Sequence, residues 1–180
     1  ILRPAQGARR EQPIAGNAVL YGATSGRLFA AGSVGERFAV RQSGAIAVVE
    51  GVGDHACEYM TAGTTLILGP VGRNLAAGLS GGVVYLFDPQ SRVLESLNPT
   101  MAAVQPRLSS EDFEWIHEAL ERHVARTFSA RAREVLARWP EAKDAFRRIH
   151  AIDHPGEQPV AWSSLAGTSP VSADSIPNVA

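Results

Sequence analysis

Residues 26–88 read GRLFAAGSVGERFAVRQSGAIAVVEGVGDHACEYMTAGTTLILGPVGRNLAAGLSGGVVYLFD and repeat one unit along their length. Glycines spaced 18, 19 and 19 residues apart each open a short apolar run. These glycines are Gly26, Gly44, Gly63 and Gly82. A second set of glycines follows the first three runs, and a further short segment, predicted to be a second strand, leads into the next cycle. One cycle is therefore predicted to be strand, glycine corner, strand, glycine corner. A fixed period of this length predicts a coil that stacks on its own neighbours.

The residue types in each cycle fit such a coil. The runs are short and rich in residues that suit a pleated, buried surface, and glycine gives the left-handed backbone that sharp corners need. Stacked coils place equivalent runs about 4.8 Å apart as parallel strands. Three cycles are clear, and a less regular one beginning near Val19 precedes them. We therefore predict a mainly β fold: a right-handed single-stranded parallel β-helix of about four coils, followed by a short C-terminal α-helical segment. The hand follows the general preference of parallel crossovers.

The rest of the chain divides around this repeat. Residues 1–15 are predicted to be a linker leading into it, free or tied along the first coil. Residues 16–89 form the β-helix, and Asp88-Pro89 ends the strand pattern because proline cannot donate to a ladder. Residues 90–152 hold a connection and the C-terminal helices. Residues 153–180 are rich in proline and serine and are predicted to be flexible, with Trp162 as a candidate anchor on another domain.

Three helices are expected between residues 108 and 149. The first spans 108–128, with Ser109 as N-cap and Asp112 three residues on. The second spans 129–139, and a short third helix spans 141–149 after Pro140. The predicted apolar face of the first helix consists of Phe113, Ile116, Leu120 and Val124. We expect these helices to be a cap or a docking pad for the open edge of the β-helix, which would otherwise pair with other chains.

Composition excludes several classes of function. A net charge of −1 gives no electrostatic basis for binding nucleic acid or an anionic membrane. No apolar run approaches the ~20 residues of a membrane span, and the single cysteine excludes an internal disulfide framework. We expect a cytoplasmic chain. Arginine outnumbers lysine, with Lys143 the only lysine, and this bias points to a bacterial source.

Residues 45–56 contain a strand followed by G-x-G-x-x-A, which taken alone is a dinucleotide-binding pattern. That pattern requires a helix next and an acidic residue about 20 positions on. Residues 57–62 are too few for the helix before the next strand, and the same glycines recur at the coil period. We therefore interpret them as coil corners. Residues 69–74 likewise lack the Gly-Lys-Ser/Thr of a phosphate-binding loop.

Two groups of residues have the chemistry of metal ligands. Asp54, His55, Cys57 and Glu58 are close in sequence, yet no second cysteine exists and alternate residues of a strand face opposite sides. A buried Cys57 and polar corner residues are the favoured interpretation. The second group consists of His117, Glu121 and His123, of which only the first two share a helix face.

The charged residues at the coil corners are assigned to structure or to a partner domain, where they pair with stacked neighbours or with free carbonyls. They are Glu36, Arg37, Arg41 and Arg73. We predict no catalytic, cofactor-binding or metal-ligating residue in this chain.

The repeat resembles a known family. Residues 16–24, 35–45, 49–61 and 72–82 are similar to the GXGXG domain of the large (alpha) subunit of bacterial glutamate synthase, and the similarity continues more loosely to about residue 149. Gln42 stands where the family is expected to have Asn, and Ala62 where a second Gly is common. Both differences fall at corners and affect local turn geometry.

The resemblance implies a role inside a larger enzyme. Glutamate synthase transfers the amide nitrogen of glutamine to 2-oxoglutarate with a reductant, giving two glutamates. In that family an amidotransferase domain releases ammonia, and a separate barrel domain carries FMN and an iron–sulfur cluster. The resemblance implies that this chain is a scaffold between those domains, with no active site and no cofactor of its own. Its partners are those domains and the small NADPH-binding subunit, with no nucleic acid and no membrane.

Two other functions stay open. The chain is similar to stand-alone GXGXG subunits of multi-subunit oxidoreductases, such as a formylmethanofuran dehydrogenase-like complex. It is alternatively an enzyme or sugar-binding β-helix acting in its own groove. The last class needs a row of carboxylates or aromatics on one coil face, whereas these coils offer mostly Ala, Val, Leu and Gly.

Overall fold

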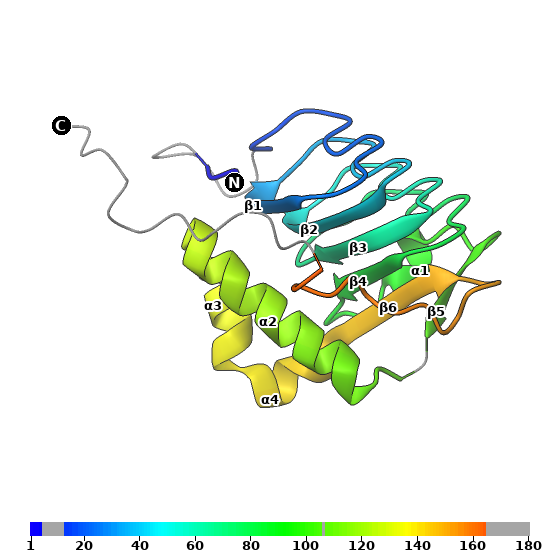
Figure 1. Ribbon diagram of the computed structural model, residues 1–180. Helices are drawn as coiled ribbons and strands as arrows, with labels where there is room; N and C mark the ends of the chain where they lie inside the picture. Colours follow the sequence, from blue (N-terminus) through cyan, green and yellow to red (C-terminus); the bar gives the residue numbers. More distant parts are fainter. Residues whose placement is uncertain (5–12, 106, 165–180) are drawn as a thin grey trace.

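The computed structural model describes residues 1–4, 13–105 and 107–164 and contains a β-solenoid with helices against one side (Figure 1). Four strands stack in chain order: β1 (Arg27–Ser33), β2 (Ser43–Gly51), β3 (Ala62–Ile67) and β4 (Val83–Phe87). Each pairs in parallel with the next, 18 or 19 residues further along the chain. The predicted fold class is confirmed. Three turns link these four strands, against the four coils predicted.

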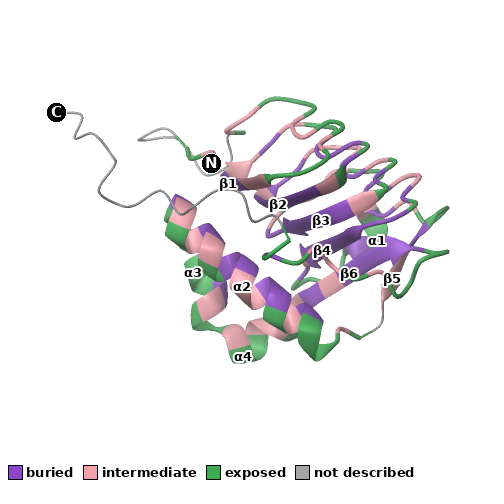
Figure 2. Ribbon diagram, in the orientation of Figure 1, coloured by how far each residue is buried: buried purple, intermediate pink, exposed green. Residues whose placement is uncertain are grey.

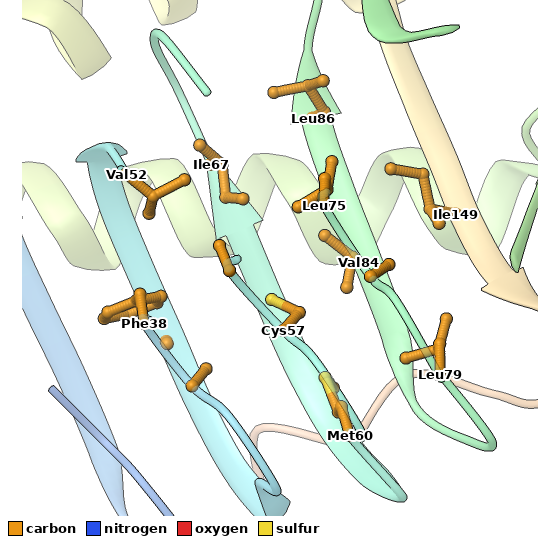
Figure 3. Close-up of a cluster of buried hydrophobic side chains, with 14 of the residues drawn as sticks. Phe38, Val52, Cys57, Met60, Ile67, Leu75, Leu79, Val84, Leu86 and Ile149 are labelled. Carbon is orange, nitrogen blue, oxygen red and sulfur yellow. The ribbon is translucent and has the colours of Figure 1, made fainter. Parts of the chain in front are cut away.

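The sheet separates two apolar cores, because alternate residues of each strand face opposite sides. Ile67 and Val84 point into the solenoid, where Phe38, Cys57 and other residues of the opposite wall meet them (Figure 3). Val49 belongs to the same buried cluster. The outward set packs under the helices: Phe29, Ile46, Val48, Leu66, Leu68, Val83 and Tyr85.

The segment of each coil opposite the sheet differs from our prediction of a second strand. Arg37, Ala39 and Arg41 have φ values of 60°, 54° and 56°, so every second residue is left-handed. Residues 18–22, 37–41, 55–59 and 74–78, here called the turn wall, share this conformation. Peptide N–H groups still donate from coil to coil, as from Arg37 to the carbonyl of Asp54 at 2.8 Å. Left-handed backbone is unfavourable for residues other than glycine, so apolar runs gave no sign of it.

Glycines at one corner allow neighbouring coils to approach closely. A Cβ on Gly72 would lie 2.5 Å from the backbone nitrogen of Asp54, and one on Gly53 would lie 2.9 Å from that of Glu36. These glycines are therefore required by the spacing between coils. Gly63 and Gly82, with φ of +97° and +84°, supply the left-handed corners predicted from the sequence.

The open edge at β4 is covered by strands. β6 (Phe146–Ala151) pairs antiparallel with β4 and with β5 (Ala102–Gln105), while α1 (Val93–Ser96) lies in the preceding connection. The predicted helix over 141–149 is wrong, since α4 (Trp139–Ala142) and η1 (Lys143–Ala145) end before β6. The prediction that helices cap this edge is wrong for the same reason, since β6 makes the ladder hydrogen bonds that an edge strand lacks.

Helices α2 (Ser110–Thr127) and α3 (Ala130–Ala137) cover the outer face of the sheet (Figures 1 and 2). The predicted N-cap is confirmed: Ser109 Oγ accepts from the Asp112 N–H at 3.1 Å, and the Asp112 carboxylate accepts from the Ser109 N–H at 2.8 Å. The predicted apolar face is partly wrong. Ile116 and Leu120 are buried with Trp115 and Ala119, while Phe113 and Val124 are half-buried at its margin.

Both described ends of the chain lie on the solenoid. Leu2 forms a bridge with Ala30, so the first residues are tied along β1. Trp162 is 5% exposed and stacks on Trp115 with ring centroids 5.1 Å apart. The prediction that Trp162 anchors another domain is therefore wrong, because its ring is used within this chain. The predicted flexibility of residues 165–180 lies outside the described residues. No helix within the described ranges is long and apolar enough to cross a membrane.

Candidate functional site

The residues that resemble metal ligands are divided between the core and the surface of the solenoid. Cys57 is fully buried in the solenoid core, and burial raises the pKa of its thiol to about 12. His55 Nδ1 lies 2.6 Å from Glu58 Oε1, whereas Asp54 turns to the next coil and accepts from Arg73 at 2.8 and 3.1 Å. Across the described residues no group of three His, Cys, Asp or Glu is placed to hold a metal ion. One buried cysteine also does not fit an iron–sulfur cluster, which requires several thiolates.

The glycine pattern at residues 51–53 does not lead into a helix. The chain passes from Gly53 into the turn wall at His55, which has φ 64°. Gly53 makes room for the neighbouring coil at Glu36. The interpretation of these glycines as coil corners is confirmed.

A buried polar cluster joins the α2–α3 junction to β2. Glu50 Oε1 accepts a hydrogen bond from Ser129 Oγ and lies 3.3 Å from His123 Nε2. Burial by itself would raise the pKa of Glu50, but its hydrogen bonds with His123 and Ser129 and the nearby charges of His123 and Arg131 outweigh burial and lower that pKa. No sequence pattern pointed to Glu50 and Ser129, since they lie 79 residues apart and share no motif.

The order of groups in this cluster argues against hydrolytic chemistry. In a hydrolase triad the imidazole lies between the hydroxyl and the carboxylate and takes the hydroxyl proton. Here the Glu50 carboxylate lies between Ser129 and His123, so the imidazole does not contact the hydroxyl that it would need to activate. Ser129 Oγ also accepts from the Ala132 N–H at 2.9 Å as the N-cap of α3. The cluster therefore fixes the helices on the sheet.

A second buried cluster has the same kind of role under the start of α2. Asp112 Oδ1 accepts from Tyr85 Oη and from Arg148 Nη1, each at 2.5 Å. Burial favours the neutral acid, yet the hydrogen bonds from Tyr85 and the Ser109 N–H, with the charge of Arg148, lower the pKa of Asp112. The side chains of Asp112 and Arg148 are 1% and 4% exposed, so this ion pair links α2, β4 and β6 out of contact with solvent.

The two helical histidines predicted to face apart do so. His117 Nδ1 lies 3.7 Å from Glu121 Oε1 at the surface, beside Trp139, whereas His123 is buried on the side of α2 that faces the sheet, against Phe29. Among the corner charges, Arg73 pairs with Asp54 as expected, and the Arg37 guanidinium lies 6.0 Å from the centre of the Tyr21 ring.

The described residues include a cleft of about 350 Å³ between the β3–β4 corner and α1. Several of its polar groups are already paired: the Asp88 carboxylate accepts from the N–H groups of Arg92 and Val93, and the Arg92 guanidinium pairs with Glu95 at 2.7 Å. Gln90 and Arg131 also line the cleft, but no group of side chains there has the arrangement of a known catalytic or metal site among the described residues.

The fold and these clusters define a class of protein: a glycine-cornered β-solenoid domain whose polar clusters hold its own elements together. Comparison with known families then identifies the group. The family model described as the GXGXG motif matches residues 1–152, and the chain belongs to this family.

Curated relatives are glutamate synthases. The chain is 49% identical over 129 residues to the ferredoxin-dependent glutamate synthase of Cyanidium caldarium, covering 72% of this chain and 8% of that protein. It is 46% identical over 139 residues to ferredoxin-dependent glutamate synthase 1 of Arabidopsis thaliana, covering 77% of this chain and 9% of that protein. It is 41% identical over 143 residues to the glutamate synthase [NADPH] large chain of Bacillus subtilis, covering 79% and 9% respectively.

The match spans less than a tenth of each relative's length. Because the relatives include both Arabidopsis thaliana and Bacillus subtilis, the similarity does not narrow the source of this chain to bacteria.

Proposed function

We propose that this chain is a scaffold part of a glutamate synthase large subunit, the enzyme that converts glutamine, 2-oxoglutarate and a reductant into two glutamates. In this proposal the solenoid packs against the amidotransferase and FMN domains and fixes the distance between them. It contributes no catalytic group of its own.

One observation carries the proposal: residues 1–152 match the GXGXG family model, and relatives at 41–49% identity are glutamate synthases. The structure supports it physically. Glycine corners set the coils at close spacing, and the two buried clusters lock α2 and α3 to the sheet. A stack held at this many points resists bending, which is the property a spacer needs.

The cofactors and further partners belong to the same proposal. FMN and the iron–sulfur cluster are assigned to other parts of the large subunit, since the single buried Cys57 is unsuited to hold a cluster. The small NADPH-binding subunit is assigned as a further partner, and the enzyme is assigned to the cytoplasm.

The test compares two half-reactions in the full-length protein that carries this sequence. A coupled enzyme consumes glutamine and 2-oxoglutarate in equal amounts. Loosening the scaffold with Gly72→Ala should raise glutamine consumption relative to 2-oxoglutarate consumption, because ammonia escapes, or should weaken assembly. Gly16→Ala, whose added Cβ meets no atom within 4 Å, should leave the ratio unchanged.

A different outcome would refute the scaffold role. Glu50→Gln and His123→Gln change the most reactive groups of the α2–α3 cluster. If either variant folds and assembles normally but abolishes one half-reaction, this chain holds a catalytic residue.

A further inference from the structure

The turn wall lies on the side of the solenoid away from α2 and α3, with the end of α1 beside its last coil, and several of its residues are exposed (Figures 1 and 2). The other sides are occupied by the chain itself: α2 packs on the outer face of the sheet, β6 pairs with β4, and Leu2 bridges to β1. On the turn wall, Tyr59 is 57% and Tyr21 48% exposed, and both rank among the exposed large apolar side chains of the described residues.

Arginines accompany these tyrosines. The N–H of Arg41 donates to the carbonyl of Glu58 at 2.8 Å, so Arg41 lies beside Tyr59 on the adjacent coil. Arg37 lies over the ring of Tyr21. Tyrosine and arginine are the residue types enriched at protein interfaces and in their energetic centres.

The backbone under these side chains favours glycine. Arg41 and Tyr59 have φ of 56° and 52°, and the equivalent positions in the flanking coils are Gly22 and Gly78, with φ of 65° and 68°. A side chain at left-handed φ costs roughly 1–2 kcal/mol that glycine avoids. The Tyr59 ring covers Gly78, where an added Cβ would lie 2.5 Å from the ring, and 57% of Tyr59 is exposed. The Arg41 side chain has no such contact within the described residues, so the fold gains little from it.

Within the turn wall the unpaired charge is positive, and the exposed carboxylate of Glu36 lies just outside it. Asp54 pairs with Arg73, and Glu58 pairs with His55. Within the described residues, by contrast, the Arg41 guanidinium makes no hydrogen bond, ion pair or ring contact. An exposed, unpaired guanidinium beside an exposed tyrosine is complementary to a carboxylate next to an apolar rim.

We infer that the turn wall is a protein-docking surface, and that its partner is an acidic surface with carboxylates opposite Arg37 and Arg41 and apolar groups that receive Tyr21 and Tyr59. This inference rests on the proposed function, under which the partner is another domain of the same enzyme.

The test uses the full-length native protein with the photo-cross-linking residue p-benzoylphenylalanine in place of Tyr59. The matched control carries the same residue in place of Leu94, which is 73% exposed on α1, outside the turn wall. The Tyr59 position should cross-link to an Asp- and Glu-rich peptide of another domain, with a yield at least about tenfold above that at Leu94.

The role of the Arg41 charge is tested by measuring the same Tyr59 cross-link in charge variants. Arg41→Glu should lower the yield at Tyr59 at least about tenfold, since tenfold corresponds to only about 1.4 kcal/mol and reversed charge is strongly unfavourable. Arg138→Glu, which reverses an exposed arginine at the end of α3, should leave the yield unchanged. Arg41→Gly removes the side chain while relieving the backbone, so a loss of yield in that variant is not a loss of folding.

The outcomes separate this inference from the proposed function. If Leu94 cross-links to another domain and Tyr59 does not, the docking surface lies elsewhere and the turn-wall inference is overturned while the scaffold survives. If Arg41→Glu has no effect on a strong Tyr59 cross-link, the acidic partner is overturned. If neither position cross-links to another domain, the turn-wall inference is overturned and the scaffold proposal loses its predicted contact.

Discussion

Gly72→Ala tests whether the coils are as closely stacked as the structure shows. A Cβ at this position would lie 2.3 Å from Asp54 Oδ1, 2.5 Å from the Asp54 nitrogen and 2.6 Å from the Gly53 carbonyl carbon. The latter two are backbone atoms, so rotating a side chain cannot relieve the clash. Moving from 2.5 Å to an ordinary contact of 3.4 Å requires a shift of 0.9 Å between coils.

Such a shift would break hydrogen bonds at this corner. The Gly72 N–H donates to the carbonyl of Val52 at 3.1 Å, and the Arg73 N–H donates to Asp54 Oδ1 at 2.8 Å. Overpacking costs about 1–3 kcal/mol, and a lost hydrogen bond adds about 1 kcal/mol. The free energy of unfolding should therefore fall by roughly 2–4 kcal/mol, which lowers the melting temperature by roughly 4–16 °C in a domain of this size.

Circular dichroism during thermal and urea unfolding measures this change, and two variants separate its possible causes. Gly16→Ala meets no atom within 4 Å and should stay within about 0.5 kcal/mol of the parent. Gly22→Ala also has open space but has φ +65°, so it should lose about 1 kcal/mol through backbone strain alone. Equal stability of all three variants would refute close stacking at Gly72.

Three further predictions follow from the buried groups. Asp112→Asn should destabilise the fold by about 3 kcal/mol at neutral pH because Arg148 is left buried without its partner. The pKa of Asp112 is lowered in the folded protein, so its stabilisation of the fold is complete above the unfolded pKa of about 3.9 and is lost as pH falls through the folded pKa. In urea unfolding, the free energies of unfolding of the parent protein and of Asp112→Asn should therefore converge below about pH 4. A constant difference between them down to pH 2 would contradict this. Cys57, with a thiol pKa of about 12, should react with iodoacetamide at pH 8 on the order of a thousandfold more slowly in the folded than in the urea-unfolded chain, and equal rates would place the thiol outside the core. Trp162→Ala should cost about 3 kcal/mol and change the tryptophan fluorescence, because its ring stacks on Trp115; an unchanged melting temperature would show that the ring is not packed there in solution.

The repeat period gave the fold class because each coil repeats the same local requirement: apolar residues for the strand and glycine for the corner. The conformation of the turn wall was not predictable in the same way. Ala39 and Cys57 adopt left-handed φ although neither residue favours it, because inter-coil hydrogen bonds and burial in the core outweigh the local preference. Sequence propensity reports only that local preference.

Strand β6 was missed for a related reason. Phe146–Ala151 has helix-compatible spacing, and its strand conformation depends on pairing with β4, some 60 residues earlier in the chain. The buried clusters were missed because their members come together only in the folded chain. By contrast, the N-cap at Ser109 was predictable, since every group that it needs lies within three residues.

The most direct test of the account is the mass of the native polypeptide that carries this sequence, measured by intact mass spectrometry or by blotting from the source cells. We predict a polypeptide several-fold longer than 180 residues, with glutamate synthase activity. A native polypeptide of about 180 residues would contradict it and favour a stand-alone assembly subunit of another oxidoreductase.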